Sequence, residues 1–288
     1  MLSRSLFVIL TAAFVFPIAL AYGEPVQITD SPAAAPEIHS LRTSDGVDFK
    51  ILGAPPKSPA PTLFVLALDA ERTLADPLYR RCGNQLANQN FLCVSVDLPC
   101  HGQERRPDEP EGLAGWRKRV DDAENPMTEL TSRLSKVLSF LIEQKMSDPE
   151  RIATCGTSRG GFAALHFAAA DERVKAVAAY SPVTELVALR EFQDVAKNMA
   201  TEELNLQHHS KRLAKCPIWI MIGDRDQRVG TDQAIQFARA LSISAAAQNL
   251  PSAAELHVCP SNGHHTPAGA EEQSAAWILR QFNRSRPE

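Results

Sequence analysis

Short apolar runs alternate with amphipathic segments along most of this chain, and this alternation restricts the fold more than any other feature. The apolar runs lie at residues 62–68, 91–96, 151–155, 174–179, 218–222 and 256–259. Runs of this length indicate strands buried on both faces of a sheet. Apolar residues recur at helical spacing in the segments 76–90, 127–146, 160–170, 231–242 and 270–282. Alternating strands and helices predict an α/β fold with a mostly parallel, doubly wound sheet.

The N-terminal region lies outside this pattern and is typical of a secretory signal peptide. Arg4 precedes an apolar run at residues 6–20, and small residues lie at its end, at Ala19 and Ala21. This run is shorter than the roughly 20 residues that a spanning helix needs, and the small residues suit a signal peptidase. We therefore expect a signal peptide at 1–21, cleaved after Ala21, and an exported mature chain without stable membrane insertion. An uncleaved anchor is the alternative.

A leader and one domain are expected after the signal peptide. Residues 22–37 are rich in Pro and Ala, which indicates an extended leader. An Asp45-Gly46 turn between the runs 38–43 and 47–52 predicts a β-hairpin. From residue 38 onward the chain is long enough for one large α/β domain, so we assign 38–288 to it.

The charge and the cysteines restrict the partners. The net charge is −4 and the isoelectric point is near 6.1, so nothing favours nucleic-acid binding. A small-molecule substrate fits better. The six cysteines are widely spaced without a CxxC pair, so we expect no metal site, assign no disulfide, and expect mostly buried free thiols.

The motif that carries chemistry is GxSxG, with Ser158 at its centre. The segment 156–160 reads Gly-Thr-Ser-Arg-Gly and follows the expected strand at 151–155. A serine on a sharp turn between a strand and a helix has a strained backbone, and its hydroxyl projects above the sheet. The glycines avoid collisions in that turn. This context favours a nucleophile over a plain glycine turn.

A serine nucleophile needs a base, and the base needs an acid that orients it. Both residue types follow the next strands. Asp224 and Asp226 come after the run at 218–222, and His264 and His265 come after the run at 256–259. At this point either aspartate and either histidine remains a candidate.

Four segments in chain order resemble the α/β-hydrolase superfamily, specifically its prolyl-oligopeptidase-like and dienelactone-hydrolase-like serine hydrolases. Residues 96–102 are similar to the DxPGHG turn of these enzymes, and the elbow around Ser158 matches theirs. Gly223, Asp226 and Val229 follow the family's GxxDxxV pattern, and a Gly-His step ends at His264. The resemblance covers residues 38–282 and implies an α/β-hydrolase fold with short lid insertions.

The resemblance also implies roles for individual residues. Ser158 is the expected nucleophile, Asp226 the orienting acid and His264 the general base, with Asp224 and His265 as rivals. The backbone N–H of Arg159 is the expected first donor of the oxyanion hole.

The second donor is less well matched, because residues 67–70 replace the family's His-Gly pair with Ala-Leu-Asp-Ala. The backbone of Asp69 aligns with the donor position. Its carboxylate must turn away, since a negative side chain beside a developing oxyanion raises the barrier. Binding a substrate cation, holding the loop or pairing with Arg72 are the roles left to that carboxylate.

Two long connections, 99–126 and 181–217, follow strands and are candidate lids, the second with a helical pattern at 185–199. The remaining candidates have plainer interpretations. His101 is expected to shape its turn, Trp116 to pack or line a pocket, and His208 and His209 to lie on the lid surface. The Arg159 side chain is expected to meet an anionic substrate group or to form a salt bridge at the rim.

Together these observations predict an exported serine carboxylesterase that works through an acyl-enzyme and needs no cofactor. The alternatives are a small peptidase, a lactone hydrolase or acyltransferase with the same triad, and a non-catalytic hydrolase fold used for binding. No GxGxxG opens a helix after an early strand, so a dinucleotide-dependent enzyme is disfavoured.

Overall fold

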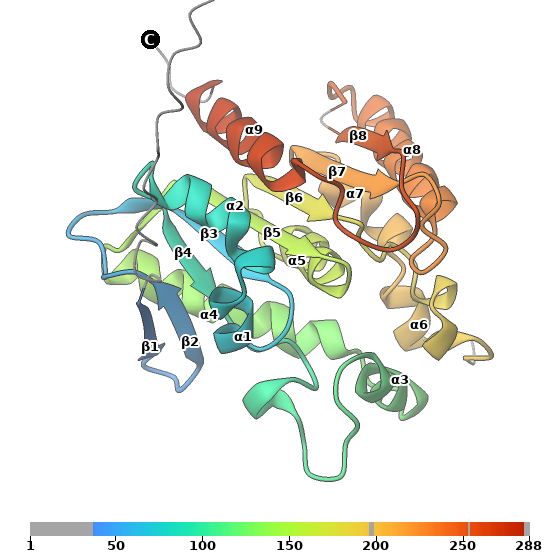
Figure 1. Ribbon diagram of the computed structural model, residues 1–288, viewed down its shortest axis with the longest axis horizontal. Coiled ribbons are helices and arrows are strands. Elements are labelled where there is room, and N and C mark those ends of the chain that lie inside the picture. The colour runs from blue at the N-terminus through green and yellow to red at the C-terminus, as the bar shows by residue number, and fades with distance from the viewer. Residues whose placement is uncertain (1–36, 196–198, 253, 285–288) are drawn as a thin grey trace, which may run out of the picture. The chain divides into compact units, whose positions relative to one another are not determined.

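An eight-stranded sheet forms the middle layer of the part of the chain described by the computed structural model, residues 37–195, 199–252 and 254–284 (Figure 1). The strand order is β1-β2-β4-β3-β5-β6-β7-β8. Strand β2 pairs antiparallel with β1 and β4, and all other neighbours are parallel. The strands are β1 (Ile38–Arg42), β2 (Asp48–Leu52), β3 (Ala60–Leu66), β4 (Leu92–Ser95), β5 (Ser147–Thr157), β6 (Ala176–Tyr180), β7 (Ile218–Gly223) and β8 (Ala254–Cys259).

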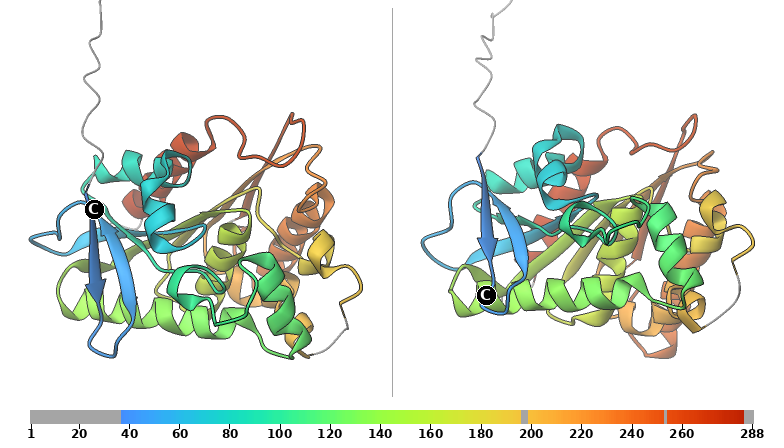
Figure 2. Two further views of the ribbon diagram at one scale, coloured as in Figure 1. Left: turned by 60° about the horizontal axis from the view of Figure 1, so that its bottom comes forward. Right: turned by 90° about the horizontal axis from the view of Figure 1, so that it is seen from below.

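Helices cover both faces of this sheet, as Figure 2 shows for α2 and α9 on one side and α4 on the other. The first face carries α1 (Ala70–Ala75), α2 (Pro77–Ala87) and α9 (Ala270–Arg284). The second face carries α3 (Leu113–Asp121), α4 (Pro126–Glu143), α5 (Arg159–Ala170) and α8 (Thr231–Ala247). Small elements lie in the second long connection: η2 (Leu186–Ala188), η3 (Arg190–Phe192), α6 (Met199–Glu203), η4 (Leu206–His209) and α7 (Ser210–Leu213).

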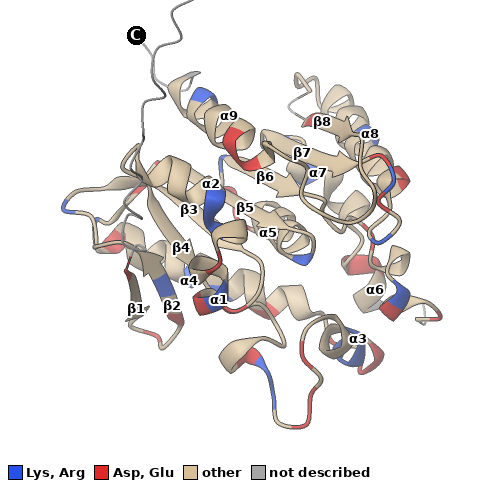
Figure 3. Ribbon diagram, viewed as in Figure 1, with Lys and Arg blue, Asp and Glu red and all other residues tan. Residues whose placement is uncertain are grey.

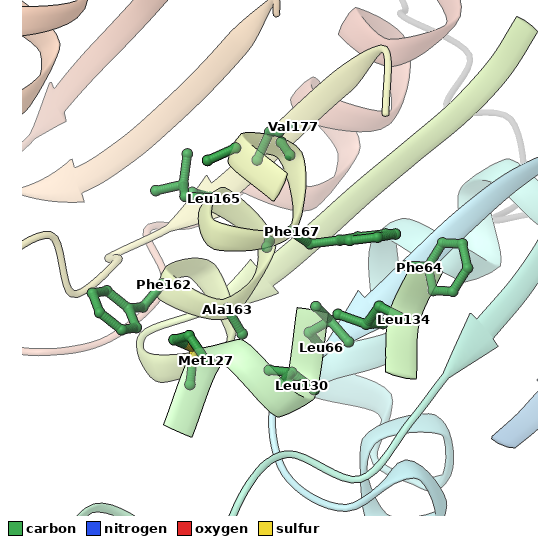
Figure 4. Close-up of a cluster of buried hydrophobic side chains, with 14 of the residues drawn as sticks. Phe64, Leu66, Met127, Leu130, Leu134, Phe162, Ala163, Leu165, Phe167 and Val177 are labelled. Carbon is green, nitrogen blue, oxygen red and sulfur yellow. The ribbon is translucent and has the colours of Figure 1, made fainter. Parts of the chain in front are cut away.

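Side chains of β3 show how a fully buried strand feeds two cores. Leu63 and Val65 pack toward α2 and α9, whereas Phe64 and Leu66 pack toward α4 and α5. Successive residues of a strand point to opposite faces, so an all-apolar strand needs helices on both. Figure 4 shows the second core, in which the rings of Phe64 and Phe167 meet edge to face at 5.2 Å. The predicted fold class is confirmed, and the β1–β2 hairpin forms as expected.

The structure corrects two predictions and adds two helices. Strand β8 is not a buried strand: it is an edge strand of the described sheet, and its residue Val258 is 44% exposed. In the described part of the segment 185–199, residues 185–195, η2 and η3 form in place of the expected helix. Helices α1 and α3 were not predicted. Residues 1–36, with the predicted signal peptide and most of the predicted leader, lie outside the described residues.

The cysteines of the chain are unpaired and mostly buried. All six cysteines are free, and only Cys259 is partly exposed. Burial raises the pKa of the Cys216 thiol to about 12, so this thiol is unreactive at neutral pH. No helix in the described ranges is long and apolar enough to cross a bilayer, and no His, Cys, Asp and Glu cluster there has the geometry of a metal site.

A buried ion pair holds the first long connection together. Both Glu109 and Arg119 are 4% exposed, and Arg119 Nε and Nη2 donate to the Glu109 carboxylate at 2.7 and 2.9 Å. Arg119 Nη2 also donates to the carbonyl of Glu104. The hydrogen bond from Arg119 lowers the pKa of Glu109 from 4.5 to about 2. The loop at 99–126 is therefore a pinned element.

Glu109→Gln is expected to lower the free energy of unfolding by about 3–5 kcal/mol at pH 7, because Arg119 would stay buried without its counter-charge. A depressed pKa contributes stability above the unfolded value of 4.5 and loses it as the pH falls toward 2. The difference between wild type and variant should therefore shrink at pH 3. Urea unfolding at both pH values tests this. Asp122→Asn is the control, because Asp122 caps the end of α3 in an exposed pair with Lys118. An equal effect there would contradict the prediction.

Candidate active site

Ser158 occupies a sharp turn between β5 and α5 at the carboxyl edge of the sheet. Its backbone angles are φ 55° and ψ −114°, a conformation that residues other than glycine adopt uncommonly. Two hydrogen bonds fix this turn: Ser158 N–H donates to the Tyr180 carbonyl at 2.8 Å, and Phe162 N–H donates to the Ser158 carbonyl. The strain expected from the GxSxG pattern is present, and it holds the hydroxyl away from the sheet.

Two glycines let the strand, the turn and the helix approach closely. The register of β3 and β5 sets Leu66 opposite Gly156. A Cβ on Gly160 would overlap with the Leu66 carbonyl, and a Cβ on Gly156 would overlap with the Gly160 carbonyl. A side chain at Gly160 would therefore push α5 away from β3, and one at Gly156 would push α5 away from β5. The first turn of α5 consequently lies against the start of the loop that follows β3.

His264 links the serine to a carboxylate. Its Nε2 lies 3.0 Å from Ser158 Oγ, and its Nδ1 lies 2.8 Å from Asp226 Oδ2. A carboxylate only accepts, so Nδ1 carries the proton and donates it to Asp226. Nε2 is then the acceptor for the Ser158 hydroxyl. The three side chains come from separate loops, after β5, β7 and β8.

Asp226 is fixed by its own loop. Its side chain is fully buried, and its Oδ1 accepts from the backbone N–H groups of Arg228 and Val229 at 3.1 and 3.3 Å. These bonds orient the other oxygen toward His264. The carboxylate therefore holds the imidazole in one tautomer and can stabilise a positive ring.

The two rival residues have different contacts. Asp224 Oδ1 accepts from Ser261 N–H at 2.8 Å, and Ser261 Oγ donates to the Gly263 carbonyl at 2.6 Å. Asp224 thus holds the loop that carries His264. The His265 carbonyl accepts from Ser181 Oγ at 2.8 Å, but the described structure contains no hydrogen bond from the His265 ring to Ser158. Of the four candidates, the structure brings Asp226 and His264 to the serine.

The predicted oxyanion donors lie on adjoining segments. Arg159 is the first residue of α5, so its backbone N–H has no acceptor within the helix. Asp69 is the N-cap of α1: its Oδ1 accepts from Arg72 N–H at 2.8 Å, and its carboxylate forms an ion pair with the Arg72 side chain. Burial raises the pKa of Asp69, but the amide and guanidinium of Arg72 outweigh it and lower the pKa. The carboxylate thus holds the loop and leaves its backbone as the candidate donor.

Of the remaining candidates, His101 and Trp116 are packed in the interior, whereas His208 is exposed. His101 is 1% exposed, and its Nδ1 lies 2.9 Å from the Pro99 carbonyl, which agrees with a turn-shaping role. Trp116 is fully buried and donates to the same carbonyl at 2.7 Å, so it packs and does not line an open pocket. His208 and His209 bond to the carbonyls of Glu202 and Glu203.

A surface cavity of about 1260 Å³ lies elsewhere, at the amino-terminal ends of β6 and β7. It is lined by residues 168–175 and 215–217, among others. Open α/β sheets bind their ligands at the carboxyl ends of the strands. This cavity is therefore separate from the site around Ser158.

Comparison with known proteins decides the family. The family model described as "Prolyl oligopeptidase family" matches residues 130–285, more than half of the chain. The chain belongs to the prolyl oligopeptidase family. Its family is therefore one of serine hydrolases of the α/β-hydrolase type, as the resemblance of its motifs implied. The match covers all three residues of the hydrogen-bonded chain from Ser158 to Asp226. The comparison with curated proteins gave no match.

Solved structures share the fold of this prolyl oligopeptidase family member at low sequence identity. TT1662 from Thermus thermophilus is 18% identical with a TM-score of 0.66, and the match covers 87% of this chain and all of that one. Acetyl xylan esterase 1 from Thermoanaerobacterium sp. is 18% identical with a TM-score of 0.59, covering 86% and 88%. A puromycin-hydrolyzing peptidase from Mycobacterium tuberculosis is 16% identical with a TM-score of 0.62, covering 89% of this chain. This chain spans only 40% of that peptidase.

Proposed function

We propose that this chain is a carboxylesterase that acts through an acyl-enzyme on Ser158. The observation that carries the proposal is the continuous hydrogen-bond chain from Ser158 Oγ through the His264 ring to Asp226. A serine hydroxyl becomes a nucleophile when a base in hydrogen-bond reach takes its proton as it attacks. The buried Asp226 carboxylate supports this by favouring the protonated ring.

The reaction proceeds in two halves. Ser158 Oγ attacks the ester carbonyl while its proton moves to His264 Nε2, and the backbone amides of Arg159 and Asp69 stabilise the oxyanion. The tetrahedral intermediate expels the alcohol, which takes the proton from His264. A water molecule then attacks the acyl-enzyme, His264 accepts its proton, and Ser158 leaves with that proton.

Esters are favoured by the neighbour acetyl xylan esterase 1, which shares the fold over 86% of this chain. A small peptidase is the second candidate, because the family model is named for an oligopeptidase and the mycobacterial neighbour is a peptidase. Export through residues 1–21 stays a prediction from the sequence.

Labelling with a fluorophosphonate, followed by intact mass and peptide mapping, tests the nucleophile. We expect one adduct, on Ser158. A folded chain that takes up no label would overturn the proposal and favour a non-catalytic binding protein, and labelling of Ser181 or Ser261 instead would overturn the assignment. Turnover of 4-nitrophenyl esters compared with aminoacyl 4-nitroanilides separates the esterase from the peptidase.

A further inference from the structure

Arg159 is a cation beside the proposed nucleophile that has no acidic partner. Its Nη1 donates to His101 Nε2 at 3.0 Å, and no carboxylate of the described residues lies within ion-pair distance of it. Glu191 and Glu111 interact with the Arg159 charge through space, but each of them forms an ion pair with another arginine. Glu191 pairs with Arg228 at 2.7 Å, and Glu111 pairs with Arg72.

The partner of Arg159 cannot neutralise its charge. His101 Nδ1 is bonded to the Pro99 carbonyl, so Nδ1 carries the proton and Nε2 is the lone-pair acceptor for Arg159. Burial lowers the pKa of His101, which keeps the ring neutral at neutral pH. The histidine orients the guanidinium, and the positive charge remains available.

The Arg159 guanidinium lies against Gly112 of the first long connection, where a larger residue would collide with it. Gly112 has φ 68°, and a Cβ there would come within 2.7 Å of Arg159 Nη1. Arg159 is thus held by α5, the turn after β4 and the start of α3. Figure 3 shows acidic and basic residues interspersed over the α3 and α6 region. A half-buried, preorganised guanidinium without a counter-charge is costly unless an anion binds it.

The strand order indicates which part of the substrate meets this cation. His101 follows β4, whereas His264 follows β8, on the other side of β5 in the sheet. His264 gives its proton to the leaving alcohol, so the alcohol part faces β8. The acyl part then extends toward Arg159 and His101.

We propose that Arg159, oriented by His101, forms a subsite for a carboxylate on the acyl part of the substrate. The preferred substrates are then monoesters of dicarboxylic acids, a conclusion that rests on the proposed esterase function. Arginine suits this role because its planar fork binds a carboxylate through two parallel hydrogen bonds.

Matched substrates test the subsite. We use 4-nitrophenyl monoesters of adipic, pimelic and suberic acid, each against the same ester with its free carboxyl methylated. In the wild type, kcat/KM should favour the anionic ester by about 10-fold or more at the best length. Arg159→Met should reduce this ratio to about 1, and Arg159→Lys, which keeps the charge without the fork, should retain part of it.

Arg190→Met is the matched control, because it removes one positive charge from an 80% exposed side chain in the second long connection. It should leave the ratio unchanged. An equal fall in this variant would mean that the overall field, and not a subsite, sets the preference, and would overturn the inference.

The outcomes separate this inference from the proposed function. No turnover of any ester by folded, unmodified wild type would overturn the esterase. Turnover with a ratio at or below 1 for every length, or a ratio that Arg159→Met does not change, would overturn only the subsite. A second pair of substrates carries the charge on the leaving group: 4-acetoxybenzoate and its uncharged methyl ester. A preference for 4-acetoxybenzoate would place the cation on the alcohol side of the site and would also overturn the inference. If Arg159→Met does not fold, the ratio measured for Arg159→Lys takes its place, and a ratio equal to that of the wild type would overturn the subsite.

Discussion

Ser158→Ala is expected to lower kcat for 4-nitrophenyl butyrate by about 10⁴-fold or more, because loss of the nucleophile leaves only binding and the oxyanion donors. The described contact of the hydroxyl is with His264 alone, so folding should survive. Steady-state kinetics with thermal unfolding checks both statements.

The control for this variant is Ser242→Ala, whose hydroxyl bonds within α8 to the Ala238 carbonyl. It should retain activity. Ser158→Ala protein that is fully folded and hydrolyses the ester within tenfold of wild type would show that another group attacks the carbonyl.

Asp226→Asn is expected to reduce kcat by about 10⁴-fold near neutral pH, as the same change does in the serine-protease triad. An asparagine NH₂ facing Nδ1 would donate to the ring. The ring proton would then move to Nε2, where the Ser158 hydroxyl could no longer donate. Because the side chain is fully buried, solvent cannot replace the lost acceptor.

Asp224→Asn is the matched control, two residues away in the same loop. The asparagine oxygen can still accept from Ser261 N–H, so the His264 loop should stay in place and the loss should be less than about tenfold. Equal losses in the two variants would indicate that negative charge in this loop, and not the contact with His264, supports the reaction.

Long, regular elements could be predicted from the sequence, whereas short and edge elements could not. Strand β3 is apolar throughout, which predicts burial on both faces, and α4 has enough turns to show helical spacing. Helix α1 has six residues, too few for a periodic signal. Its N-cap, Asp69, was the available signal, since an aspartate before a helical segment is a common start. Strand β8 is apolar enough to suggest burial, but its edge position depends on the whole sheet order.

The candidate site could be predicted in outline because its three residues follow separate strands in a recognisable order. The choice between His264 and His265 could not be made from spacing, since two adjacent side chains differ only in how their loop is held. That loop is held by Asp224 through Ser261 and by Ser181 through the His265 carbonyl. These anchors come from β6 and β7 and carry no motif of their own. Likewise, only the structure shows that no described carboxylate lies within ion-pair distance of Arg159.

The close approach of Gly160 to the Leu66 carbonyl has a consequence for engineering. The elbow and the turn after β3 share one backbone contact with no side chain between them, so neither can shift without displacing the other. Libraries that randomise one segment while keeping the other will mostly yield inactive variants. Exchanging both segments together from one donor enzyme offers the better route to altered selectivity.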